Sequence, residues 1–262
     1  MGARLAFAGR MSSSLAARRA LGLWGGRLLA PITATVSSWR RARMFHPEGV
    51  VYRAQVTAVA EGDLKELGER LSGQALLRFS SAWWRGKDWP DVLGAALRFR
   101  DGPIADASVQ PGDQDLLLAT IRFPWTTPFA PLTTRFGSFL WNHYHAVSPF
   151  QVPGVGLAKL RLRAPRIANH SGTTRAAHLE SCVASGQALF VLELRRLATP
   201  WSRRRWEPVA LVLVKAPVDI DQEALRFSPF HSGRELKPTG FVHHLRVAAY
   251  EASQQARPAR AG

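Results

Sequence analysis

Seven short segments with the composition of β-strands run through the chain from residue 50 onward. They are rich in β-branched and apolar residues, and turns containing Gly, Pro or Asp separate them. The segments are 50–59, 74–80, 92–99, 114–121, 157–164, 187–195 and 208–215. A run of strands with helical insertions predicts an α+β fold built on an antiparallel barrel or sandwich with flanking helices. No internal repeat of fixed period interrupts this pattern.

Two helices are expected between the strands. In residues 61–72, Leu64, Leu67 and Leu71 fall on one helical face. In residues 132–147, apolar and aromatic residues recur at every fourth position, which also favours a helix. His143 and His145 would then lie on different faces of that helix and would not form a metal pair.

The first 42 residues are expected to lie outside the folded domain, which we place at 43–262. Residues 1–43 hold eight arginines and no acid, so they carry half of the formal net charge of +16. This composition is typical of a transit peptide, of a disordered extension, or of a start codon assigned too early. Gly25, Gly26, Arg27 and Pro31 interrupt its apolar part, so no transmembrane segment is expected. We predict a cytoplasmic protein, with an organellar location or attachment to a membrane surface through this extension as alternatives.

The single cysteine and the basic charge exclude several classes of protein. Cys182 alone cannot build a disulfide framework or a zinc site with several thiolates, and a buried thiol is expected. The chain lacks zinc-finger spacings, lysine tracts and a ribonucleoprotein signature, so specific nucleic-acid binding is not expected. A basic segment with tryptophans at 201–206 leaves contact with nucleic acid or membrane open.

Near the C-terminus, residues 241–257 combine arginines and a tyrosine on one helical face. Arg246, Tyr250 and Arg257 are spaced by four and seven residues. A guanidinium beside a phenol favours the phenolate, and a phenolate can ligate ferric haem. The alternative is a surface helix with solvated arginines.

Several short motifs, in this order along the chain, resemble those of haem catalases. They are Arg43-Met-Phe-His46-Pro-Glu-Gly49 before the first strand, Leu77-Arg78-Phe79-Ser80, Gly94-Ala-Ala-Leu-Arg-Phe99, Asp115-Leu-Leu, and Arg246-Val-Ala-Ala-Tyr250 with Arg257 seven residues later. The resemblance implies a catalase-type antiparallel barrel, with a haem pocket between the barrel and a C-terminal helix.

The resemblance also implies a role for each matching residue. His46 corresponds to the distal histidine, Ser80 to the distal serine beside it, and Tyr250 to the proximal iron ligand that Arg246 keeps ionised. The haem propionates would be bound by three arginines: Arg43, Arg78 and Arg257. The implied cofactor is haem b, and the implied substrate is hydrogen peroxide or an organic hydroperoxide, with lipid hydroperoxides among the candidates.

At one position the sequence departs from the family in a way that bears on activity. Catalases carry an asparagine on the fourth strand that orients the peroxide, and ungapped counting places Thr120 there. Efficient catalase activity is therefore doubtful, and peroxidase-like chemistry is favoured. The alternatives are a non-catalytic haem-binding protein on the same barrel, or a cofactor-free basic binding module that uses the leader and residues 201–206. A homo-oligomer is compatible with all three.

Overall fold

The structure is a computed structural model that describes residues 48–239, without 85, 103, 105–106, 124–125, 127–128, 166–171, 199, 201–204 and 222–224. The chain divides into two units, Phe45–Pro238 and a second made of Met1–Met44 with Thr239–Gly262. Nearly all described residues belong to the first unit, whose architecture is given below.

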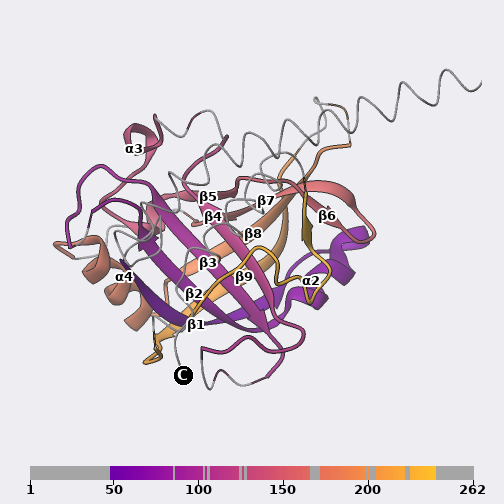
Figure 1. The fold of residues 1–262 in the computed structure, drawn as a ribbon, viewed down its shortest axis with the longest axis horizontal. Helices are drawn as coiled ribbons and strands as arrows, with labels where there is room; N and C mark the ends of the chain where they lie inside the picture. Colours follow the sequence, from indigo (N-terminus) through magenta and orange to yellow (C-terminus); the bar gives the residue numbers. More distant parts are fainter. Residues whose placement is uncertain are drawn as a thin grey trace, which may run out of the picture. The chain divides into compact units, whose positions relative to one another are not determined.

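Eight antiparallel strands close into a barrel (Figure 1). The strands are β1 (Glu48–Ala58), β2 (Gly73–Ser81), β3 (Leu93–Arg100), β4 (Gln114–Ala119), β5 (His143–Ala146), β7 (Gly156–Arg163), β8 (Leu189–Arg196) and β9 (Glu207–Pro217). Each pairs with its neighbour in the order β7-β5-β4-β3-β2-β1-β9-β8, and β7 pairs with β8 to complete the ring. Two short strands, β6 (Phe150–Val152) and β10 (Lys237–Pro238), extend from β7. The predicted antiparallel barrel is confirmed.

Strand alternation fills the barrel with apolar side chains. On β2, Ala75, Leu77 and Phe79 point inward and belong to one large core cluster. The ring of Phe79 lies 5.2 Å from that of Phe139 and 5.4 Å from that of Phe190, measured between centroids. The interior is therefore a packed core, so any ligand site of the described barrel has to lie on its outer face or at its ends.

The helix predicted at 61–72 is present as a 3-10 turn, Gly62–Leu64, followed by α2 (Lys65–Leu71). Leu64, Leu67 and Leu71 are buried, as their spacing predicted. Gly68 marks a close approach to β9, since a Cβ atom there would lie 2.9 Å from the Val209 carbonyl oxygen.

The single helix predicted at 132–147 is wrong. The structure forms α3 (Ala130–Thr133), a 3-10 turn at Phe139–Trp141, and β5. The Asn142 amide accepts from the Arg135 N–H at 2.9 Å and donates to the Ser138 carbonyl at 2.7 Å, which replaces helical hydrogen bonds. Strand alternation then places His143 and His145 on the same outer face of β5, with ring centroids 6.4 Å apart.

A helix that the sequence did not suggest to us, α4 (Arg175–Ala184), precedes β8. Thr174 caps it by accepting a hydrogen bond from the Ala177 N–H at 3.2 Å. Cys182 on this helix is a buried free thiol, as expected. Within the described part of the chain, no helix has the length and apolar character needed to cross a bilayer.

Candidate functional site

Two of the predicted site residues, Arg78 and Ser80, lie on the outer face of β2. Their neighbours Leu77 and Phe79 point into the core, whereas Leu76 points outward and packs on Val51. Both candidate side chains are buried, Arg78 at 6% exposure and Ser80 at 5%. The barrel therefore brings these two polar groups together on one covered surface.

The strands beside Arg78 and Ser80 present small side chains to the same surface. Ser80 is in register with Gly94 on β3, and Gly94 is in register with Ala119 on β4. Arg78 is in register with Ala96. Residues in register project from the same face of a sheet, so the row through Ser80 is a strip that runs across three strands without a bulky group, whereas the row through Arg78 and Ala96 ends at Leu117.

This strip fits a flat ligand that carries an anion. The Ser80 side chain is nearly buried on this strip, and its hydroxyl can both donate and accept a hydrogen bond. A buried guanidinium is suited to a carboxylate, which it binds through paired hydrogen bonds. A haem has a flat macrocycle and carboxylate side groups, so the residues present are compatible with it.

Thr120 is not brought together with Ser80. Its hydroxyl accepts from the Leu93 N–H at 3.1 Å and lies 2.7 Å from the Thr134 hydroxyl. Because Thr134 donates its own proton to the Ala130 carbonyl at 2.8 Å, Thr120 is the donor between the two hydroxyls. Thr120 thus ties the end of β4 to β3 and α3, and the residue in the row with Ser80 is Ala119 instead.

The other predicted site residues fall outside the described residues. They are Arg43, His46, Arg246, Tyr250 and Arg257. Their roles stay predictions. Where the chain is described, no group of three or more His, Cys, Asp or Glu side chains gathers to hold a metal ion.

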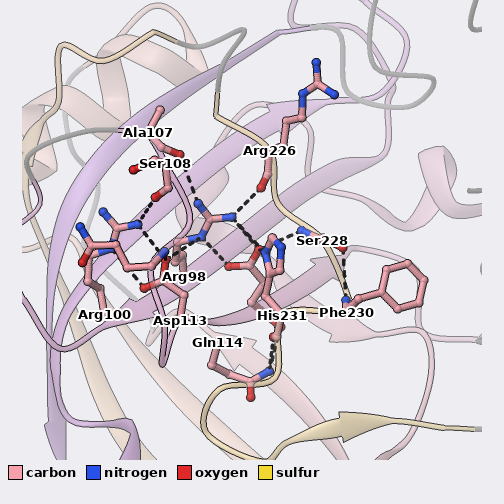
Figure 2. Close-up of polar contacts among 12 residues, drawn as sticks. Arg98, Arg100, Ala107, Ser108, Asp113, Gln114, Arg226, Ser228, Phe230 and His231 are labelled. Atoms are coloured by element: carbon pink, nitrogen blue, oxygen red, sulfur yellow. Dashed lines mark hydrogen bonds and ion pairs between the residues drawn. The ribbon is translucent and has the colours of Figure 1, made fainter. Parts of the chain in front are cut away.

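A buried charged cluster that we had not predicted occupies the same outer face (Figure 2). Arg98 on β3 donates to both carboxylate oxygens of Asp115 on β4, each at 2.8 Å, and both side chains are fully buried. His231 Nδ1 lies 2.8 Å from the same carboxylate, which also accepts from the Ser228 N–H at 2.8 Å. The cluster therefore fastens the segment around residues 226–232 to the barrel.

A second arginine–aspartate pair lies beside the first. Arg100 Nη2 donates to Asp113 Oδ2 at 2.7 Å, and this arginine also donates to the Ser108 carbonyl (Figure 2). The sequence could have predicted these pairs. Two arginines, Arg98 and Arg100, lie two positions apart on β3, and two aspartates, Asp113 and Asp115, lie two positions apart where β4 begins. Buried charge pairs of this kind fix the positions of the segments that pack over β3 and β4, here those that contain Ser108 and Ser228.

The outer face of β5, β7 and β8 is strongly cationic. Burial, followed by repulsion from Arg161, His143, Arg122 and Lys159, lowers the pKa of His145 to about 3. Burial and the nearby Arg161 also lower the pKa of His143. Both imidazoles are therefore driven towards the neutral form.

Trp206 is stacked by two of the arginines on this cationic face. The guanidinium of Arg161 lies 4.2 Å from the indole centroid, and that of Arg195 lies 4.8 Å from it. Glu193 supplies the balancing carboxylate, since it accepts from Arg161 Nε and from Arg163 Nε. The rest of the segment 201–206 lies outside the described residues, apart from Arg205.

Comparison with solved structures identifies the architecture. A fungal catalase superposes with a TM-score of 0.58 at 13% identity, covering 85% of this chain and 61% of that one. The fold is catalase-like. A bacterial catalase gives 0.56 at 14% identity, and catalase A from Saccharomyces cerevisiae gives 0.57 at 12%, each over 85% of this chain. The match spans about three-fifths of those catalases, at 59% and 63% of the latter two. No protein-family model and no curated protein matches the sequence.

Proposed function

We propose that this chain is a haem-dependent oxidoreductase of the catalase-like type that acts on hydrogen peroxide or an organic hydroperoxide. One observation carries the proposal. On a barrel with the catalase-like fold, a buried arginine and a nearly buried serine lie on one outer face beside small side chains of the next two strands. These are Arg78 and Ser80, two residues to which the sequence resemblance assigns a place around haem.

Haem b would be held by charge and by one axial bond. Arg78, with Arg43 and Arg257, would bind the propionates, because arginine forms paired, charged hydrogen bonds with carboxylates. Tyr250 would ligate the iron, and Arg246 would keep its phenol ionised. Bound in this way, the haem supplies the redox chemistry that reduces a peroxide.

The chain itself would handle protons and position the substrate. His46 would take a proton from the incoming peroxide and return it to the leaving oxygen, as a general base and then a general acid. The Ser80 hydroxyl would hydrogen-bond the His46 imidazole and fix its orientation. These two roles fall to side chains of this protein, and the electrons that reduce the peroxide would come from the haem when it is bound.

Peroxidase activity is favoured over efficient catalase activity. The residue in the row with Ser80 is Ala119, which offers no hydrogen bond to orient a peroxide, and the Thr120 hydroxyl is already bonded to Leu93 and Thr134. These observations also give weight to a second candidate, a haem-binding protein without catalytic turnover. A cytoplasmic location, the absence of specific nucleic-acid binding, and homo-oligomer formation stay predictions.

The deciding experiment is an absorption spectrum of haem-reconstituted protein, wild type beside Tyr250→Phe. We expect a ferric spectrum typical of tyrosinate ligation, which the variant loses. Tyr144→Phe is the matched control, because the Tyr144 hydroxyl donates to the Phe139 carbonyl inside the core. If neither wild type nor control binds haem, the proposal fails and a cofactor-free basic binding module takes its place.

Peroxide turnover then separates the enzyme from a simple haem carrier. We expect the reconstituted protein to oxidise an organic donor at the expense of peroxide, and His46→Ala to lose about a hundredfold or more of that rate. A haem-loaded wild type with no more turnover than His46→Ala would establish the carrier instead.

A further inference from the structure

One end of the barrel displays a group of large apolar side chains to solvent. The connection between β2 and β3 exposes Trp83, Trp84 and Trp89, and the first turn of α3 exposes Phe129 and Leu132. Leu132 is 81% exposed and Phe129 is 63% exposed. A group of exposed apolar side chains, unlike a single one, indicates an interaction surface. We call these five residues the aromatic tip.

Packing at their base holds the two parts of the aromatic tip together. Ala82 and Val92, at the two ends of the tryptophan loop, form a small buried cluster with Ala130 of α3. Figure 1 shows α3 standing apart from the strands of the barrel. The five apolar side chains therefore belong to one protruding surface.

The tryptophan loop is held in a fixed shape. The buried carboxylate of Asp91 accepts from the backbone N–H groups of Trp83, Trp84 and Val92, at 3.1, 3.2 and 2.7 Å. The Trp84 indole N–H donates to the Pro90 carbonyl at 3.0 Å. Since these bonds fix the loop, the exposure of its indoles is a built-in feature of the fold.

Positive charge surrounds the aromatic tip. The Lys87 ammonium lies 4.4 Å from the centroid of the Trp89 ring. Asp88 is neutralised by Arg175 of α4, whose Nε lies 3.1 Å from the carboxylate. Arg122 and Arg135, on either side of α3, are exposed. Residues 116–179 contain no Asp or Glu, so α3 and its flanking loops add only cations to this end of the barrel.

A lipid surface matches this combination of groups. Indoles favour the interface of a bilayer, aliphatic side chains enter its acyl region, and basic side chains attract anionic headgroups. A nucleic acid would use stacked rings in a groove and has no place for a protruding leucine. We propose that the aromatic tip docks this protein peripherally on an anionic lipid bilayer.

The test is sedimentation of the full-length protein with vesicles. Wild type is expected to bind vesicles of equal parts phosphatidylcholine and phosphatidylserine. The double variant Trp83→Ser/Leu132→Ser should bind them about tenfold or more weakly, because it removes two inserting groups. Lys87→Gln should weaken binding to these vesicles while leaving binding to pure phosphatidylcholine vesicles unchanged.

The matched control is Val109→Ser. Val109 is exposed, but it lies in the connection between β3 and β4, at the opposite end of the barrel from the loop between β2 and β3. This control should bind as wild type does. Circular dichroism of all variants should match wild type, since the substituted side chains are exposed.

Two results would overturn the proposal. One is wild-type protein that does not sediment with either vesicle. The other is a Trp83→Ser/Leu132→Ser variant that binds as tightly as wild type, which would assign the lipid contact to another basic segment. If this second result comes with a loss of binding to single-stranded DNA, the aromatic tip is assigned to nucleic acid. None of these results depends on haem.

Discussion

Asp115 on β4 holds Arg98 on β3 through both carboxylate oxygens, each 2.8 Å from a guanidinium nitrogen, in the fully buried outer layer of the barrel. The same carboxylate accepts from the Ser228 N–H. One side chain thus joins two neighbouring strands to a segment more than a hundred residues later. Its removal should therefore affect the whole domain.

The first prediction is that Asp115→Asn destabilises the protein strongly. It removes the nearer of the two buried carboxylates beside the Arg98 guanidinium and leaves only Asp113, whose Oδ2 lies 3.8 Å from Arg98 Nε. The free energy of unfolding should therefore fall by about 3 kcal/mol. Urea unfolding followed by circular dichroism measures the change. Asp101→Asn is the control, because Asp101 is exposed and its partner Arg234 also donates to the Ser72 carbonyl. The control should cost about 1 kcal/mol or less, and equal costs would refute a special role for Asp115.

The second prediction separates Ala119 from its neighbour Thr120. If the strip beside Ser80 is the peroxide side of a haem site, Ala119→Asn supplies the missing hydrogen-bond donor there. Peroxide turnover of the haem-loaded variant should rise by about tenfold or more, as expected for an oriented donor.

Thr120→Asn should behave differently. It breaks the hydroxyl contacts to the Leu93 N–H and to Thr134, so it should lower the unfolding midpoint without raising turnover. Turnover that rises in Thr120→Asn but not in Ala119→Asn would contradict this prediction. It would show that Thr120, the position given by ungapped sequence comparison, faces the peroxide, and that Ala119, the position given by the strand register, does not.

The third prediction concerns pH. The pKa of His145 falls from its ordinary value of 6.5 to about 3, so the unfolded chain takes up the proton first as pH drops. The contribution of His145 to stability is thus fully present above pH 6.5 and is lost as pH falls towards 3. Replacing it by Gln should flatten the stability profile across this window.

Titration of the His145 ring by NMR tests the cause directly. After burial, Arg161 is the largest cause of the shift, so Arg161→Gln should move the pKa of His145 upward. A normal value in the wild-type protein would show that the imidazole is better solvated than the structure indicates.

The fourth prediction concerns Cys182. Burial raises the pKa of its thiol, and the thiolate is the reactive form. Reaction with a thiol reagent at neutral pH should be slow in native protein and should reach the rate of a free thiol in urea. Rapid labelling of native protein would mean that α4 opens readily.

The strand pattern predicted an antiparallel barrel or sandwich because seven of the eight barrel strands, all except β5, carry their own signal. Ala75, Leu77 and Phe79 alternate with outward residues, which is a local property that a sequence displays. The helix expected at 132–147 failed because Phe136, Leu140 and Tyr144 imitate helical spacing, while Asn142 satisfies the backbone groups of a turn. Side-chain bonds of that kind compete with helical ones and leave no periodic trace.

Only part of the candidate site could be predicted from the sequence, for a related reason. Arg78 and Ser80 share a strand, so alternation alone places them together. The relation of Ser80 to Ala119 runs through Gly94 and depends on the register of two strand pairs, which the sequence does not fix. Asp115 meets Ser228 only after the chain has folded back over the barrel, and no local pattern signals such a contact.

Closure of the ring depends on β9, which pairs with β1 on one side and β8 on the other. During synthesis, β1 can therefore complete its pairing with β9 only after the ribosome has translated residue 217. Until then, β1 and β8 are open edges that another nascent chain can pair with. Interrupting translation before this point should yield aggregates, and folding should be slow, because its last contacts join distant parts of the sequence.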